Sequence, residues 1–470
     1  MKKILLPFLI LELTSPISAQ LWLSLDEGVS CDEQSAFTSA ITNMYYDEAN
    51  NRIDVIGYFR HNNECEENRG FAYWDGQNWN SYPGTCVVPP HSLIQFQGEK
   101  YAVGTIVCES FNVEFCKIQG DSWNLIEDAP SMDGYTLLKE IDNHFYIGTM
   151  MPEDENGDVP LLLEYFPEEN TYNVLAKNAA FSLVNFEELL VYNDSLFIGG
   201  KFSTYQPGVP NSGKDNLAKI SGNTIEKVGQ GINSNSNTYS MCVHRDTLFI
   251  GGIFGSENFP GFTNEPYVYL IYYCNGEIKP YPIQANAYVS TMVSYNDILY
   301  LGGWFTQLGG DACYGVGAIV NSQAISLNNI QFIGGAGFPI EAFAPSIHKI
   351  LIVDDHLYMA GSFEYIGQDG PYGNIAKLST PLSEFSKVVE DKMEWEMKLY
   401  PNPADEYMTL EIPLGAKGTL QIFNNLGQLV HQENISQVKT TLSLSHLPTG
   451  TYACILKTPN HTMREKIIVK

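Results

Sequence analysis

Asp246-Thr-Leu-Phe-Ile-Gly-Gly-Ile-Phe254 is one copy of a motif that recurs along this sequence. Close copies are Asp194-Ser-Leu-Phe-Ile-Gly-Gly-Lys-Phe202, Asp297-Ile-Leu-Tyr-Leu-Gly-Gly-Trp-Phe305 and Asp355-His-Leu-Tyr-Met-Ala-Gly-Ser-Phe363. Three weaker copies precede them. Aligned on the second glycine, the copies lie about fifty residues apart, at Gly57, Gly104, Gly148, Gly200, Gly252, Gly303 and Gly361. A period of this length predicts an array of similar structural units.

Each repeat shows the same order of short apolar segments. A strand such as Tyr239–Val243 precedes the motif, a third strand such as Tyr267–Tyr272 follows a polar loop, and turns such as Asn275-Gly276 lead to a fourth. A four-stranded antiparallel meander that is apolar on both faces must pack between neighbours. The sequence therefore predicts an all-β fold with a seven-bladed β-propeller over residues 20–380. The glycines allow close backbone approach, and the motif phenylalanines fill the space between blades.

The two ends of this region predict how the ring closes. The last repeat runs through Asn374–Leu378 and lacks a fourth strand, whereas Leu21–Gly28 has the pattern of a fourth strand without a blade of its own. Pairing the two would complete the last blade and leave no exposed edge. The Leu-Phe-Ile-Gly-Gly motif resembles those of kelch-like propellers. That resemblance implies a fold and not an activity.

A different pattern follows a predicted linker, 381–398. Alternating apolar residues over 399–470 predict a small C-terminal β-sandwich. The segment resembles the type A C-terminal sorting domain of the type IX secretion system of Bacteroidetes. The resemblance implies recognition by that secretion machinery, cleavage in the linker, and release or attachment to the cell surface; an ordinary accessory sandwich is the alternative. The predicted sorting motif comprises Pro401, Asn402, Pro403, Gly427, Gly450 and Tyr452.

The N-terminus indicates export, and the overall charge limits the classes of partner. Met1-Lys2-Lys3, the apolar residues 4–11 and Ser18-Ala19 predict a signal peptide over 1–19, removed before Gln20. After it, no apolar run is long enough to be a transmembrane segment. The formal net charge of −28 disfavours nucleic acid as a partner, since like charges repel. We expect a protein that is secreted or displayed on the outer cell surface.

Nine cysteines fit an oxidising compartment without forming a disulfide-rich scaffold. Cys108 and Cys116 flank a short connection between two strands and are the predicted disulfide. Cys31, Cys65 and Cys86 lie in one region, where two of them could pair. No cysteine or histidine spacing indicates zinc.

No catalytic motif is present, so the catalytic residues are unknown and a binding protein is favoured over an enzyme. Asp154, Asn156 and Asp158 present oxygen ligands at alternate positions, as calcium sites do, but the loop departs from the EF-hand pattern. An acidic surface loop is the alternative. No other cofactor is implied.

The second connection of each meander is long and variable, which places most loop variation on one face of the propeller. Six aromatic residues of these loops are the predicted ligand-binding residues, for a glycan or a protein; packing onto the rim is the alternative. A glycoside hydrolase or polysaccharide lyase using loop carboxylates is the rival function, and a structural adhesin component is a third. The six residues are Tyr205, Phe259, Phe262, Tyr314, Tyr365 and Tyr372.

Overall fold

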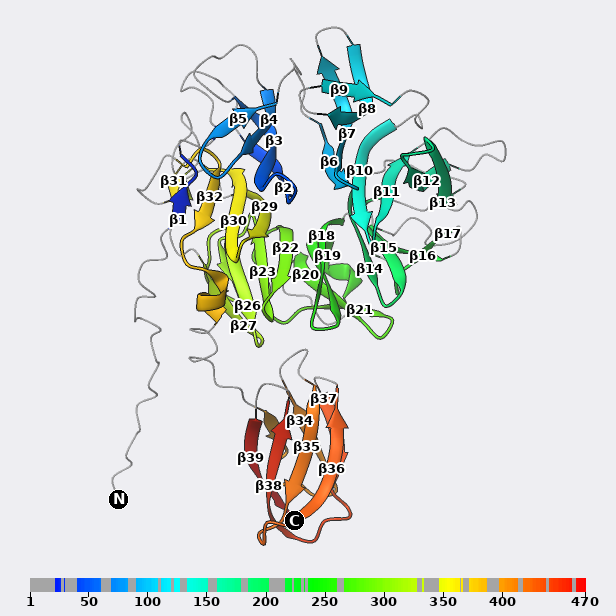
Figure 1. Ribbon diagram of the computed structural model, residues 1–470. Coiled ribbons are helices and arrows are strands. Elements are labelled where there is room, and N and C mark those ends of the chain that lie inside the picture. The colour runs from blue at the N-terminus through cyan, green and yellow to red at the C-terminus, as the bar shows by residue number, and fades with distance from the viewer. Residues whose placement is uncertain are drawn as a thin grey trace.

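A computed structural model gives the architecture (Figure 1). It describes residues 22–26, 29, 40–60, 69–82, 90–108, 111–119, 122–126, 133–150, 159–178, 185–202, 216–221, 224–229, 232, 236–259, 266–327, 332–333, 346–363, 365–366, 372–386, 397–412, 417–436, 439–458 and 462–470. The predicted signal peptide, the candidate calcium loop and Cys31, Cys65 and Cys86 lie outside these residues. Within them, no helix is long and apolar enough to cross a membrane.

The described strands up to residue 378 form seven four-stranded antiparallel meanders, of which the third and fourth are joined into one eight-stranded sheet by a parallel pairing of Tyr135 with Asn185. The first three are β2 (Ala40–Asp47), β3 (Arg52–Arg60), β4 (Arg69–Trp74) and β5 (Trp79–Ser81); β6 (Ser92–Phe96), β7 (Glu99–Cys108), β8 (Phe111–Gln119) and β9 (Ser122–Leu125); β10 (Asp133–Ile141), β11 (His144–Met150), β12 (Val159–Phe166) and β13 (Thr171–Asn178).

The next two are β14 (Asn185–Tyr192), β15 (Ser195–Lys201), β16 (Leu217–Ser221) and β17 (Thr224–Lys227); β18 (Asn237–His244), β19 (Thr247–Gly255), β20 (Tyr267–Cys274) and β21 (Glu277–Pro280). The last two are β22 (Val289–Tyr295), β23 (Ile298–Gly303), β26 (Val316–Val320) and β27 (Gln323–Ser326); β29 (Ser346–Val353), β30 (His356–Ser362), β32 (Ile375–Leu378) and β1 (Trp22–Ser24). Short pairs join β24 (Gln307–Leu308) to β25 (Asp311–Ala312) and β28 (Phe332–Ile333) to β31 (Tyr365–Ile366). A 3₁₀ helix, η1, spans Ser256–Asn258.

The meanders stand around a common axis as a β-propeller. The first strand of each contacts the first strand of the next, and β29 contacts β2 to complete the circle. An apolar core lies between each neighbouring pair of sheets. The motif phenylalanines Phe202, Phe254, Phe305 and Phe363 are at most 3% exposed within these cores. The prediction that they fill the gap between blades is confirmed.

The predicted closure is also confirmed. Strand β1 pairs antiparallel with β32, with Trp22 opposite Leu378, and the two lie side by side in Figure 1 although they come from opposite ends of the propeller sequence. Tyr372 Oη donates to the Trp22 carbonyl at 3.0 Å. The Val29 carbonyl accepts from Asn374 Nδ2 at 2.8 Å. Segments separated by more than three hundred residues thus share one sheet.

The second glycine of the motif is required by a bulge in the adjacent first strand. In the last four meanders the register shifts once in that strand, for example between Thr238 and Ser240. A Cβ on Gly252 would lie 2.1 Å from the Asn237 carbonyl oxygen, and one on Gly303 would lie 2.0 Å from that of Tyr288. Any side chain would therefore push the two strands apart. The close approach predicted for these glycines occurs within a sheet, between its first and second strands.

The tail forms a separate sandwich of two sheets, as predicted. One sheet contains β33 (Lys398–Tyr400), β34 (Tyr407–Glu411) and β37 (Lys439–Ser443). The other contains β36 (Leu429–Ile435), β35 (Gly418–Phe423), β38 (Gly450–Lys457) and β39 (Thr462–Val469). Its core draws only on residues from Met397 onward. The fold class, an all-β propeller followed by a small β-sandwich, is confirmed.

Two local predictions need correction. The predicted linker begins with a packed segment, because residues 382–386 form a helical turn whose Leu382 and Phe385 are buried in the core of the last meander. The predicted disulfide between Cys108 and Cys116 is wrong. Cys116 lies opposite Ala102, six residues before Cys108 on β7, which separates the two cysteines by about 20 Å. A disulfide requires Cα atoms within about 7 Å.

Candidate functional site

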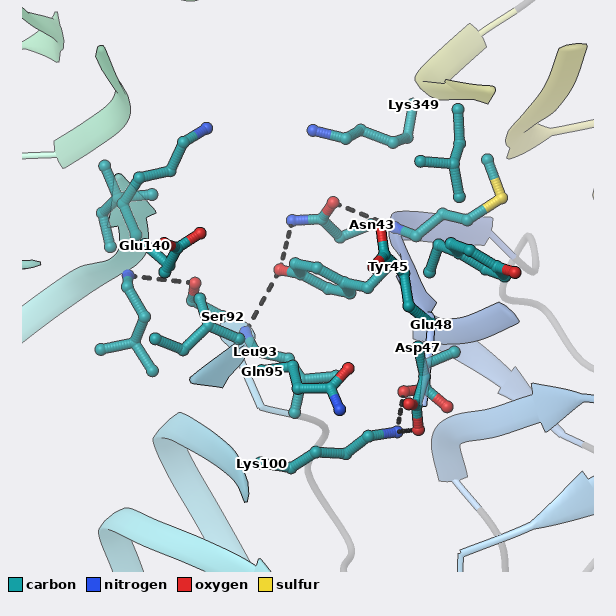
Figure 2. A pocket seen from close by; sticks show the side chains of 18 of the residues that line it. Asn43, Tyr45, Asp47, Glu48, Ser92, Leu93, Gln95, Lys100, Glu140 and Lys349 are labelled. Atoms are coloured by element: carbon teal, nitrogen blue, oxygen red, sulfur yellow. Dashed lines mark hydrogen bonds and ion pairs between the residues drawn. The ribbon is translucent and has the colours of Figure 1, made fainter. Parts of the chain in front are cut away.

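The first strands of the meanders surround a chamber on the propeller axis. A cavity of about 980 Å³ is lined by residues of β2, β6, β10, β14 and β29 (Figure 2). A second cavity of about 400 Å³ is lined by β14, β18, β22 and β29 and shares Asn43, Lys139 and Lys349 with the first. The two therefore form one continuous polar chamber, of the size that small-molecule sites have.

The bulges deliver polar side chains to this chamber. Five first strands carry two consecutive residues with polar groups at the point where the register shifts and strict alternation of faces is lost; in four of them the pair stands between apolar residues. All ten residues line the chamber. They are Thr42-Asn43, Glu187-Glu188, Tyr239-Ser240, Ser290-Thr291 and His348-Lys349.

Hydrogen bonds hold part of the chamber wall in place. Tyr45 Oη accepts from Asn43 Nδ2 at 2.7 Å and from the Leu93 backbone N–H at 3.2 Å (Figure 2). Burial raises the pKa of Tyr45 to about 12. Ser92 Oγ accepts from the Leu138 backbone N–H at 3.1 Å. These bonds tie β2, β6 and β10 to one another across the boundaries between sheets.

Two adjacent carboxyl groups occupy different environments. Glu188 forms an ion pair with Lys139, with 2.6 Å between Oε1 and Nζ. Glu187 accepts a hydrogen bond from Asn185 Nδ2 at 2.7 Å. Burial, together with the charge of Glu188, raises the pKa of Glu187 to about 7. One carboxylate is thus neutralised by a lysine, while its neighbour holds a proton close to neutral pH.

Lys349 projects from the bulge of β29 into the open part of the chamber (Figure 2). Burial lowers its pKa. The preceding residue, His348, has its Nε2 2.9 Å from Ser346 Oγ, and burial lowers its pKa to about 4. Burial therefore disfavours the charged form of both neighbouring side chains on this strand.

A closed ion network forms another part of the chamber wall. Lys100 Nζ lies 2.7 Å from Asp47 Oδ2 and also pairs with Asp54. Arg52 Nε lies 3.2 Å from Asp47 and 3.3 Å from Asp54. Tyr82 Oη donates to Asp54 at 2.7 Å. Each charge in this network has opposite charges beside it.

A row of aromatic rings borders the chamber on the face that carries the second connections. Ring centroids are 5.9 Å apart between Tyr239 and Tyr288, 5.7 Å between Tyr288 and Trp304, and 6.2 Å between Trp304 and His348. Tyr269 joins the row at 6.0 Å from Tyr288. Trp304 is 41% exposed, and Tyr239 and His348 also line the chamber. We call Tyr239, Tyr269, Tyr288, Trp304 and His348 the aromatic row.

The predicted loop aromatics are placed differently. Phe259 and Tyr372 are each 5% exposed and belong to cores between sheets, so neither offers a ring face to a ligand. Tyr314 is half-buried against the same core as Tyr372. Tyr205, Phe262 and the side chain of Tyr365 lie outside the described residues, as do Asp154, Asn156 and Asp158. Among the described residues, no group of histidine, cysteine and carboxylate side chains could hold a metal ion.

Sequence reasoning missed both the chamber residues and the aromatic row. The available signal was the polar pair that interrupts an apolar first strand, as in Phe186-Glu187-Glu188-Leu189 and Ile347-His348-Lys349-Ile350. The row was missed because its members occupy strand ends and not the loops between them.

The predicted sorting residues lie together at one end of the tail. Asn402 Nδ2 donates to the Lys466 carbonyl at 2.8 Å, and its Oδ1 accepts from the Ile468 N–H at 3.0 Å, which fastens the Pro401–Pro403 segment to β39. Tyr452 Oη donates to the Pro448 carbonyl at 2.6 Å. Gly427, at φ +77°, closes the turn between β35 and β36. Gly450 pairs with Val469.

Residues 398–470 match the family model described as a secretion system C-terminal sorting domain. The tail is a sorting domain of that family. It implies recognition by the type IX secretion machinery, and export to the cell surface or the medium. The rest of the chain is not covered by this match.

Known structures share only a remote likeness with the chain. PorZ, a surface component of the type IX secretion system of Porphyromonas gingivalis, is 11% identical with a TM-score of 0.39, over 93% of this chain and 60% of that one. The chain therefore spans 60% of the length of that protein. An α-L-arabinanase of Penicillium chrysogenum is 8% identical with a TM-score of 0.36, over 77% of this chain and 99% of that one. Among curated proteins, none matches this sequence.

Proposed function

We propose that this exported propeller is a glycan-binding protein that takes its ligand on the aromatic row and in the adjoining chamber. The carrying observation is the row itself. Rings that are partly exposed, side by side and next to a polar cavity suit a sugar chain, because the apolar face of a sugar stacks on an aromatic ring while its hydroxyl groups form hydrogen bonds.

The polar part of such a site is supplied by the bulges. Thr42, Asn43, Ser240, Ser290 and Thr291 give the chamber neutral donors and acceptors, which match hydroxyl groups. The sorting domain brings the propeller to the cell exterior, where glycans are available as ligands. A chamber of this volume favours a small polar ligand or the end of a chain over a folded protein.

A glycan array probed with the full chain tests this proposal, followed by affinity measurements on the best binder. Trp304→Ala should lower the affinity about tenfold, since stacking on an exposed ring contributes on the order of 1 kcal/mol. Tyr172→Ala is the matched control, because Tyr172 is similarly exposed, at 39%, but lies on the outer strand β13. Equal losses in the two variants, or no binding by the parent protein, would contradict the proposal.

Glycan hydrolysis is the rival function, and one observation favours it. Glu187, with a pKa of about 7, could act as an acid beside Glu188, which pairs with Lys139; hydrolases use two carboxyl groups in such different environments. Release of reducing ends from a bound glycan, abolished in Glu187→Gln without loss of affinity, would establish the enzyme. Binding without release by the parent protein would leave a binding protein.

A further inference from the structure

Three lysines line the larger cavity, and they differ in their partners. Lys100 pairs with Asp47 and Asp54, and Lys139 pairs with Glu188. Lys349 lies within ion-pair or hydrogen-bond distance of no group in the part of the chain that the structure describes, and its side chain extends towards the open space (Figure 2). Among these three lysines it is therefore the one whose amino group is not already engaged by a carboxylate.

The position of Lys349 is set by the backbone. Its Cα lies opposite Ala360 of β30, directly after the register shift that follows Ile347. Ile347 and Ile350 on either side are buried in the core between the last two sheets, so the strand cannot turn the lysine away from the axis. An unpaired ammonium held in a partly enclosed site is costly, and an anion that reaches it relieves that cost.

Most carboxyl groups at the chamber have partners of their own, and Glu188 is the one that also attracts Lys349 electrostatically. Asp47 and Asp54 are neutralised by Lys100 and Arg52, and Glu188 is neutralised by Lys139. Glu140 accepts a hydrogen bond from the Asn143 backbone N–H at 2.8 Å. The remaining groups at the cavities are Glu48, Glu187, Tyr45, Tyr46, Tyr239 and His348.

We infer that the chamber receives an anionic group of the glycan, a carboxylate or a sulfate on a sugar, at Lys349 Nζ. This inference rests on the proposed function and names its ligand class as an acidic glycan. Lys349 forms a charge-assisted hydrogen bond with the anion, and the sugar rings extend from there to the aromatic row. His348, a member of that row, is the neighbour of Lys349 on β29.

Glu187 then makes binding depend on pH. It lines both cavities with Lys349, and its pKa of about 7 means that it gains a negative charge as the pH rises through neutrality. That charge opposes an anionic ligand. The affinity for an acidic glycan should therefore fall between about pH 6 and pH 8, and Glu187→Gln should remove most of that fall.

Calorimetric titration of the full chain with three probes tests the inference: a galacturonic acid trimer, a sulfated galactose disaccharide and a neutral galactose trimer. One of the two acidic probes should bind the parent protein. Lys349→Met should lower the affinity for that probe by about tenfold or more and leave the affinity for the neutral probe unchanged. Lys279→Met is the matched control, since Lys279 is exposed on the outer strand β21. Lys349→Arg should retain acidic binding.

Each outcome separates the two proposals. Preference for one acidic probe identifies carboxylate or sulfate as the anion. Binding of the neutral probe alone, or equal acidic binding by the parent protein and Lys349→Met, overturns the inference and leaves glycan binding intact. No binding of any probe, together with a negative glycan array, overturns both.

Discussion

The closed ion network and Lys349 differ in how their charged groups are paired, although both lie at the same chamber. In the network, Asp47, Arg52, Asp54 and Lys100 are packed so that every charge meets its opposite, with Tyr82 completing the hydrogen bonds. Lys349, by contrast, forms no ion pair among the described residues, and Glu188, which attracts it from a greater distance, pairs with Lys139.

The difference separates charges that are fully paired within the protein from a side chain that forms no ion pair. A complete network favours one arrangement of its members and leaves nothing for a ligand. A buried charged group without a partner lowers the stability of the ligand-free protein, and such groups cluster at sites where a ligand supplies the partner. Both sets line the same cavity, so the contrast lies in the partners of each charge.

The largest expected effect comes from breaking the network. Lys100→Met leaves two buried carboxylates with Arg52 alone, and the free energy of unfolding should fall by about 3–5 kcal/mol. Denaturant titration measures it. Lys117→Met is the control, because Lys117 forms a single partly exposed pair with Glu99 at 3.3 Å and should cost under about 1 kcal/mol. Similar losses in both variants would mean that the network is not a stabilising unit.

A smaller effect of opposite sign is expected at Glu187. Its folded-state pKa, about 7, lies above the ordinary 4.5, so the folded state holds its proton over a range in which the unfolded chain has released it. Stability is therefore lost as the pH rises from about 4.5 to about 7, and the loss is complete above that. Glu187→Gln should be more stable than the parent protein at pH 8, by about 1–3 kcal/mol, and equally stable near pH 4.

Thermal and denaturant unfolding at both pH values measure this difference. The exposed Glu226→Gln is the control and should follow the parent protein. A Glu187→Gln protein that is less stable than the parent at pH 8 would show that the carboxylate is held by favourable contacts.

The smallest effect is expected at Lys349. Replacement by methionine removes an amino group without an ion-pair partner and keeps most of the apolar stem. The free energy of unfolding should therefore be equal to that of the parent protein or higher by up to about 1 kcal/mol. Denaturant titration beside Lys100→Met makes the comparison direct. A loss as large as that of Lys100→Met would assign Lys349 to the structural set.

The sequence predicted those parts of the fold that local chemistry determines. The repeated motif predicted the second strands and their turns, because Asp194, Asp246, Asp297 and Asp355 all stand at positive φ in tight hairpins, where aspartate is favoured. Leu21–Gly28 predicted the closing strand, because a lone strand and a three-stranded sheet each leave an unpaired edge.

The candidate site could not be predicted in the same way. Bulges set the direction of Glu187, Glu188 and Lys349, and a bulge depends on how two strands pair rather than on either strand alone. The wrong disulfide has a related cause. Cys108 and Cys116 are close in sequence, but the ladder between β7 and β8 carries them apart.

The closure of the ring by β1 has a consequence for biogenesis. Trp22 is among the first residues of the propeller to be synthesised, and its partner Leu378 is among the last. This pair therefore cannot form until nearly the whole propeller has been synthesised. A chain that ends before β32 leaves β1 and β30 each with an unpaired edge. The sorting domain comes after β32 in the sequence, so a chain that carries this domain also carries the strand with which β1 pairs.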